Sequence, residues 1–158
     1  MKNKVIKGVL LLYAISLVVA CSTNKPEPVI DKEQIKKEIQ AREDDYAAVY
    51  NSGELKSIGY YPEDAVSFPQ NHSPLEGKRA IVDYLTAHMD SLAMTHKISF
   101  KTNEVFVTSD GDQVLEIGYY KVVDSTNTAV NTGNYMSLFV KRDGKYVCLR
   151  DMSASDMP

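Results

Sequence analysis

Apolar side chains recur at intervals of three or four residues in the first part of the domain, and this spacing predicts a helix from residue 31 to about residue 50. Asp31 and Gln34 have the spacing of a capping box, and Gly53 follows the segment as its C′ residue. The face with this periodicity comprises Ile35, Ile39, Arg42, Tyr46, Val49 and Tyr50. The pattern therefore predicts a helix of about five turns that places one face against a core.

A second helix is expected over residues 79–92, and a short one over residues 54–59. The face of the longer helix comprises Ile81, Leu85, His88, Met89 and Leu92. Between these helices, residues 64–69 resemble a short strand closed by Pro69, and residues 70–77 are expected to form a loop.

From Lys97 onward the period changes to two, which predicts strands. Turn residues at 109–112 and 142–145, with a polar loop at 124–131, divide this part into four strands. Helices followed by an antiparallel meander indicate an α+β fold. Strands of about ten residues or more are long for an ordinary sheet, so this sheet is expected to curl around the first helix as a cone with a pocket.

Residues 1–20 have the pattern of an export signal, with three lysines ahead of an uncharged run at residues 8–20. That run would span about 20 Å as a helix, short of the roughly 30 Å hydrocarbon core of a bilayer. Val-Val-Ala before Cys21 resembles a bacterial lipobox, in which the cysteine is lipidated and becomes the new N-terminus. The alternative is an ordinary signal peptide followed by a chance cysteine.

These features predict a signal peptide at 1–20, a lipid-anchored tether at 21–30 and one domain at 31–158. The expected location is the bacterial cell envelope, in the outer membrane or on the periplasmic face of a membrane. Without the signal, 15 basic residues stand against 21 acidic ones. This acidic balance argues against nucleic acid as a partner and against electrostatic membrane binding, so lipid on Cys21 would do the anchoring.

Six sequence blocks follow one another in an order that resembles a known superfamily. They are YAAVYNSGEL, YYPEDAVSFP, EGKRAIVDYL, the Val114–Tyr120 run, GNYMSLFVKRDGKYVCLRD and the ending SASDMP. Over residues 33–158 the chain looks like nuclear transport factor 2-like proteins, and most like their SnoaL-like and ketosteroid isomerase-like members. The resemblance implies a cystatin-like cone and a homodimer formed across the outer face of the sheet. Such domains include isomerases, dehydratases, cyclases, ligand-binding modules and assembly domains, so only the site residues can indicate the chemistry.

Tyr46 matches the phenolic oxyanion donor of the steroid isomerases, because it stands seven residues before Gly53. Phe68 occupies the position of their carboxylate base, and Met136 that of their protonated carboxyl group. The resemblance therefore implies that their proton shuttle cannot operate here. Tyr46 could equally be a core tyrosine whose hydroxyl bonds one buried partner.

Two carboxylates remain candidate catalytic residues. Glu116 shares strand parity with an apolar face, where burial would raise its pKa as a general base requires; alternatively it faces solvent or pairs with a lysine. Asp151 loosely matches the late-strand base of SnoaL-type cyclases, or else it accepts backbone hydrogen bonds at the strand exit. Asp64 is interpreted as a turn or cap residue.

The other reactive side chains do not form a recognisable site. His72, His88 and His96 are scattered, so neither a metal site nor a cofactor is expected, and Cys148 is interpreted as a buried structural thiol. The candidate ligand contacts are Tyr46, Phe68, His88, Tyr120 and Met136.

A binding domain for a small apolar or aromatic molecule is the preferred interpretation. The first alternative is a cofactor-free isomerase, dehydratase or cyclase, with Glu116 or Asp151 as base and Tyr46 as electrophile. The second is an interaction module that uses the exposed sheet face for dimerisation or for an envelope partner.

Cys21→Ala tests the lipoprotein prediction. Without the thiol no acyl chain can be attached, so the variant should be an unprocessed or soluble exported protein. Metabolic labelling with a palmitate analogue measures this. Label that persists on the variant would contradict the prediction.

Overall fold

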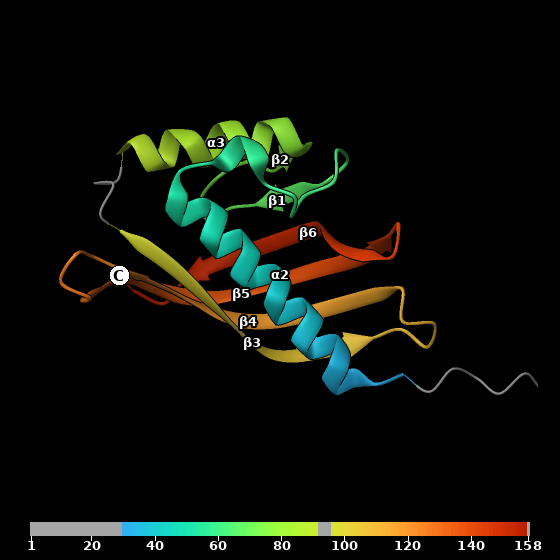
Figure 1. Ribbon diagram of the computed structural model, residues 1–158. Helices are drawn as coiled ribbons and strands as arrows, with labels where there is room; N and C mark the ends of the chain where they lie inside the picture. Colours follow the sequence, from blue (N-terminus) through green and yellow to red (C-terminus); the bar gives the residue numbers. More distant parts are fainter. Residues whose placement is uncertain (1–29, 92–95, 158) are drawn as a thin grey trace, which may run out of the picture.

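The computed structural model describes residues 30–91 and 96–157, in which two α-helices pack on a curved six-stranded sheet (Figure 1). Helix α2, Lys32–Ser52, crosses the concave face of the sheet. As predicted, the Asp31 side chain accepts a hydrogen bond from the Gln34 amide, and Gly53 ends the helix in the left-handed conformation with φ 80°. Helix α3, Lys78–Ser91, lies over the end of the sheet that carries the two short strands.

Four long strands form the predicted antiparallel meander. They are β3 (Lys97–Val107), β4 (Gln113–Val123), β5 (Ala129–Arg142) and β6 (Lys145–Ser155). The turns that join β3 to β4 and β5 to β6 lie where the sequence predicted them. The α+β fold with a curved sheet wrapped around the first helix is therefore confirmed.

The region between the helices differs in detail from the prediction. Residues 54–59 contain only a single 3₁₀ turn, η1, at Leu55–Ser57. Strand β1, Val66–Phe68, joins the sheet by parallel pairing with β6, and the expected loop contains a two-residue strand β2, Leu75–Glu76, which pairs with β1. Neither pairing could be predicted, because segments of two or three residues have no measurable periodicity.

Helix α2 also covers the edge strand β3 through three polar side chains. Lys36 donates to the Asn103 carbonyl at 2.6 Å, and Gln40 bonds both the Thr102 amide and the Phe100 carbonyl. Asn51 bonds the amide and the carbonyl of Ile98 at 2.8 and 2.9 Å. These contacts satisfy backbone groups that an edge strand otherwise leaves unpaired, and they fix the helix over the sheet.

The outer face of the sheet carries a row of apolar side chains that nothing in the described chain covers. Phe68, Met152, Met136 and Ile117 face one another in register across β1, β6, β5 and β4. Met152 is 54% exposed and Met136 37% exposed, and Phe106, on β3, is 55% exposed. A contiguous apolar surface of this kind is typical of a protein interface.

We propose that a second copy of the chain covers this face, and we predict a dimer for residues 25–158 at tens of micromolar. Met136→Glu places a charge in the middle of the row and should shift the protein to monomer, whereas Ala87→Glu, at an exposed position of α3, should not. Sedimentation equilibrium measures the mass. A wild-type protein that stays monomeric would contradict the proposal.

Candidate functional site

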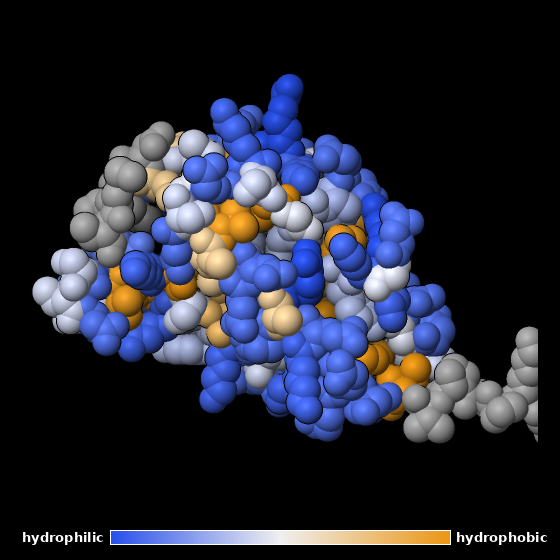
Figure 2. Space-filling view, in the orientation of Figure 1, coloured by the Kyte–Doolittle hydropathy of each residue, from blue (hydrophilic) through white to orange (hydrophobic). Residues whose placement is uncertain are grey.

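A cavity of about 320 Å³ lies between the helices and the concave side of the sheet. Figure 2 shows hydrophobic residues gathered between the C-terminal part of α2 and α3, on a surface that is otherwise mostly hydrophilic. Phe100 and seven tyrosines contribute rings to the lining; the tyrosines are Tyr46, Tyr50, Tyr60, Tyr61, Tyr84, Tyr120 and Tyr135. The cavity has room for a small molecule with at least one ring system.

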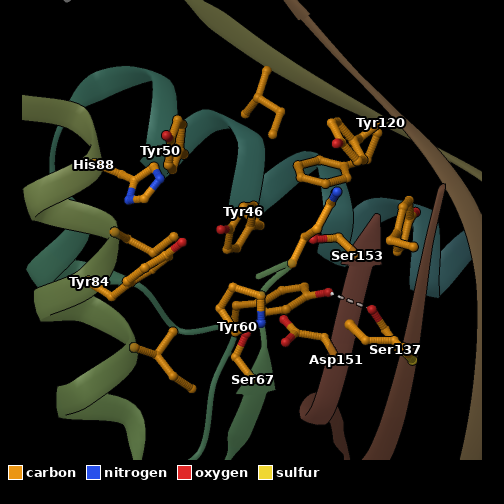
Figure 3. A pocket seen from close by; sticks show the side chains of 18 of the residues that line it. Tyr46, Tyr50, Tyr60, Ser67, Tyr84, His88, Tyr120, Ser137, Asp151 and Ser153 are labelled. Carbon is orange, nitrogen blue, oxygen red and sulfur yellow. Dashed lines mark hydrogen bonds between the residues drawn. The ribbon is translucent and has the colours of Figure 1, made fainter. Parts of the chain in front are cut away.

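Tyr46 stands at the centre of this aromatic lining (Figure 3). Its ring centroid lies 4.8 Å from that of Tyr60 and 5.4 Å from that of Phe100, and both pairs are strongly inclined. Tyr61 meets the same ring edge-on at 6.1 Å. The rings support one another at preferred aromatic distances, so the wall is preformed.

Two glycines make room for two of the lining tyrosines. Gly118 of β4 lies opposite Tyr135 of β5, and Tyr120 lies opposite Gly133. A Cβ atom on Gly118 would come within 2.2 Å of the Tyr135 ring, and one on Gly133 within 2.7 Å of the Tyr120 ring. The absence of these side chains lets each tyrosine lie across its neighbouring strand, so the two Gly-x-Tyr sequences interlock.

Asp151 of β6 places a carboxyl group in the cavity wall. Its Oδ2 accepts a hydrogen bond from the Tyr61 hydroxyl at 2.5 Å, and Ser67 also bonds the carboxyl group. Its Oδ1 is buried and has no hydrogen-bond partner among the described residues. Burial raises the pKa of Asp151 above its ordinary value, and the bonds from Ser67 and Tyr61 only partly oppose that shift.

Glu43 and Glu116 form a buried carboxyl pair beneath α2, with exposed fractions of 1% and 0%. Glu116 accepts hydrogen bonds from Thr102 at 2.6 Å and from Tyr135 at 2.8 Å, and Tyr60 donates to Glu43. Burial, and then the charge of Glu116, raise the pKa of Glu43 well above 4.5. The hydrogen bond between the carboxyl groups raises the pKa of Glu43 and lowers that of Glu116, so Glu43 holds the proton and donates it.

The tyrosines around these acids are neutral hydrogen-bonding groups. Burial, and then the charge of Asp151, raise the pKa of Tyr46 and of Tyr61 well above 10. A hydrogen bond between Tyr46 and Tyr61 opposes the shift at Tyr46. Tyr46, Tyr61 and Asp151 therefore form one hydrogen-bonded chain along the cavity wall.

Of the residues singled out from the sequence, the structure brings Tyr46, His88, Tyr120 and Asp151 to the cavity. Glu116 is as buried as strand parity indicated, but it lies outside the lining and contacts the cavity only through Tyr135 and Glu43. Cys148 is a free, fully buried thiol.

Phe68 and Met136, both expected as ligand contacts, are not in the lining. Phe68 is 43% exposed, and both side chains belong to the outer row described above. The family resemblance implied both positions, but it does not determine which face of this sheet they occupy. Cys21 and Leu92 lie outside the described residues.

Several site residues were missed from the sequence, chiefly Glu43, Tyr60, Tyr61 and Tyr135. Glu43 stands four residues after Ile39 and three before Tyr46, so helical spacing alone places it on the buried face. An acidic residue on the buried face of this helix is the sequence feature that could have indicated the site. Tyr60 and Tyr61 follow a 3₁₀ turn and had no periodic signal to place them.

The described residues carry no cluster of three side chains suited to a metal ion. Within that same part of the chain, no helix is both long and apolar enough to cross a membrane.

The comparisons with known proteins identify the fold. The chain matches a domain of unknown function with a cystatin-like fold from Nostoc punctiforme, at TM-score 0.67 and 15% identity over 78% of each chain. A ketosteroid isomerase-like protein from Erwinia carotovora atroseptica matches at TM-score 0.61 and 16% identity, over 82% of this chain and 100% of the other.

A nuclear transport factor 2-like protein from Novosphingobium aromaticivorans matches at TM-score 0.66 and 14% identity, over 85% of this chain and 92% of the other. No family model and no curated protein matches the sequence. The chain thus has the cystatin-like fold of nuclear transport factor 2-like and ketosteroid isomerase-like proteins.

The Glu43 proton should make stability depend on pH. Above about pH 4.5 the unfolded chain loses this proton while the folded chain keeps it, so the free energy of unfolding falls as pH rises, by up to about 1.4 kcal/mol per unit. Glu43→Gln keeps both hydrogen bonds and removes the titration. Its stability relative to wild type should therefore rise with pH from about 4.5 upward.

Urea melts between pH 4 and 8 measure this difference, with Glu38→Gln, an exposed acid on the same helix, as the control. A constant difference between wild type and Glu43→Gln over that range would show that Glu43 titrates as an exposed acid does.

Proposed function

We propose that this chain is a small-molecule-binding domain that holds a mostly apolar or aromatic ligand in the cavity between α2, α3 and the sheet. The observation that carries the proposal is the aromatic lining, in which seven tyrosines surround a preformed space. Pockets that bind drug-sized molecules combine apolar and aromatic walls with a few placed polar groups. Here those polar groups are Asp151, Tyr46 and Tyr61.

The lining also gives reasons to prefer binding over catalysis. Ketosteroid isomerases, according to the resemblance above, use two carboxyl groups and a phenol, and the two acid positions are Phe68 and Met136 in this chain. Both of these side chains face away from the cavity. What remains in the lining, the carboxyl groups of Asp151 and Glu43 and several hydrogen-bonded phenols, is enough to orient a ligand.

A cofactor-free isomerase, dehydratase or cyclase is the second candidate, and Asp151 is the observation that favours it. Its buried Oδ1 has no partner among the described residues, and burial raises the pKa of the carboxyl group toward that of a working general base. In that case Tyr46 or Tyr61 would stabilise the developing oxyanion.

We also propose that the domain is displayed on the bacterial cell envelope through lipid on Cys21. The support is the export signal at 1–20 and the small residue before Cys21. The described domain carries no feature that would replace this anchor, since its acidic balance disfavours an anionic membrane surface.

The neutral probe N-phenyl-1-naphthylamine, whose fluorescence rises in apolar surroundings, tests the binding proposal. It should bind once per chain and saturably. Tyr46→Phe removes one hydroxyl from the wall and keeps the ring, so affinity for a ligand that bonds this hydroxyl should fall about two- to twelve-fold, or roughly 0.5 to 1.5 kcal/mol.

For a probe that contacts only the rings, the affinity should not change in Tyr46→Phe. The loss of the hydroxyl should then appear as a melting temperature lowered by a few degrees. Under the catalytic alternative, Tyr46→Phe should lower the rate about a hundred- to thousand-fold. Tyr119→Phe, on the outer face, is the matched control, and Met136→Glu shows whether the probe binds the outer face instead. Probe binding that Met136→Glu abolishes would contradict the cavity assignment.

A further inference from the structure

Asp151 lacks the positive partner that a buried carboxylate normally has. One of its oxygens accepts from Tyr61, and the other is buried with no partner among the described residues. Isolated charges inside proteins are costly, and they are usually paired with a cation or neutralised by protonation. Asp151 lines the cavity, so the wall contains a carboxyl group whose hydrogen-bonding capacity the described residues satisfy only in part (Figure 3).

No lysine or arginine lines the described part of the cavity. Arg150, next to Asp151 in the chain, turns to the other face of the sheet, opposite Leu138. Its guanidinium donates to the backbone carbonyls of Asp64 and Leu149. His88 lines the cavity from α3, where its ring lies 4.5 Å from that of Tyr84, and Figure 3 shows it across the cavity from Asp151. Residues 30–91 and 96–157 thus provide no guanidinium or ammonium group for this carboxylate.

The rings beside Asp151 present electron-rich faces to the same space. Tyr46, Tyr60 and Tyr61 form a corner in which neighbouring ring centroids are 4.8 to 6.1 Å apart. Aromatic faces attract cations, and the attraction strengthens where water is excluded. A second carboxyl group, Glu43, lines the cavity on the same side as this corner. An anionic ligand would be repelled by Asp151, whereas a cation would meet a carboxylate and several rings at once.

We propose that the ligand of this cavity carries a positively charged amino group, which pairs with the carboxylate of Asp151 and contacts the tyrosine faces around it. The remainder of the ligand is aromatic or apolar and occupies the part of the cavity lined by Leu75, Ile81 and Leu85. The inference rests on the proposed binding function and defines its ligand class as hydrophobic amines.

Three probes that share one ring system separate charge from shape. These are 1-naphthylmethylamine, 1-naphthylmethanol and 1-naphthoate, which are respectively cationic, neutral and anionic at neutral pH. The amine should bind the full-length chain roughly ten- to hundred-fold more tightly than the alcohol, because a charged hydrogen bond and cation–π contacts are added. The naphthoate should bind more weakly than either. Saturation-transfer NMR and calorimetry measure all three affinities.

Asp151→Asn keeps the shape and removes the charge, so the preference for the amine should fall to the smaller part that the tyrosine faces contribute. Asp112→Asn removes the same charge from an exposed turn and should preserve the preference. If Asp151→Asn does not fold, the wild-type ranking of the three probes still decides the proposal.

Each result points to a different conclusion. Binding of the alcohol as tightly as the amine would overturn the inference and leave the binding function intact. An amine preference that is undiminished in Asp151→Asn would overturn the role of Asp151. Failure of all three probes to bind would count against the proposed function as well as the inference.

Discussion

The carboxyl group of Glu43 reaches from α2 to Glu116 of β4 through a hydrogen bond that is fully buried. Such a pair is tolerated only when the remaining oxygens also have donors, and here Tyr60, Thr102 and Tyr135 supply them. The donors come from the segment after η1, from β3 and from β5. The pair therefore requires all these elements to be in place together, and it sets the position of α2 over the sheet. Since Tyr46 is one helical turn beyond Glu43, the same constraint positions the cavity wall.

Sequence periodicity predicted the helices, the four long strands and the curvature, because each of those elements is long enough to carry a repeat. The sequence also indicated Tyr46 and Asp151 as candidate site residues, and both line the cavity. The short strand expected at residues 64–69 is present as β1, but the sequence could not indicate its parallel pairing with β6, strand β2, or the position of Tyr60 and Tyr61 after a 3₁₀ turn. Phe68 and Met136 show a different limit of sequence analysis. The family resemblance predicted that they contact a ligand, but the parity of their strands places them on the outer face of the sheet.

The two Gly-x-Tyr sequences show how local pattern and register combine to make a site. Either one alone is a glycine inside a strand, which ordinarily weakens it. In antiparallel register, Gly118 meets Tyr135 and Gly133 meets Tyr120, so each glycine is covered by a ring. The rings that cover them are then turned inward, and one hydroxyl, that of Tyr135, bonds the buried acid pair. The spacing in the sequence is informative only once the register is known.

The acids of the site differ in how many hydrogen-bond donors the chain provides for their oxygens. Glu116 is surrounded by donors, including the Glu43 proton, so the energetic cost of its burial is offset internally. Tyr61 donates to Oδ2 of Asp151, and Oδ1 is buried without a partner among the described residues. The fold thus gives Glu116 donors from β3 and β5 and leaves Asp151 with fewer donors in the wall of an aromatic cavity. For that reason the charge of the ligand, more than its shape, is expected to decide what this cavity holds.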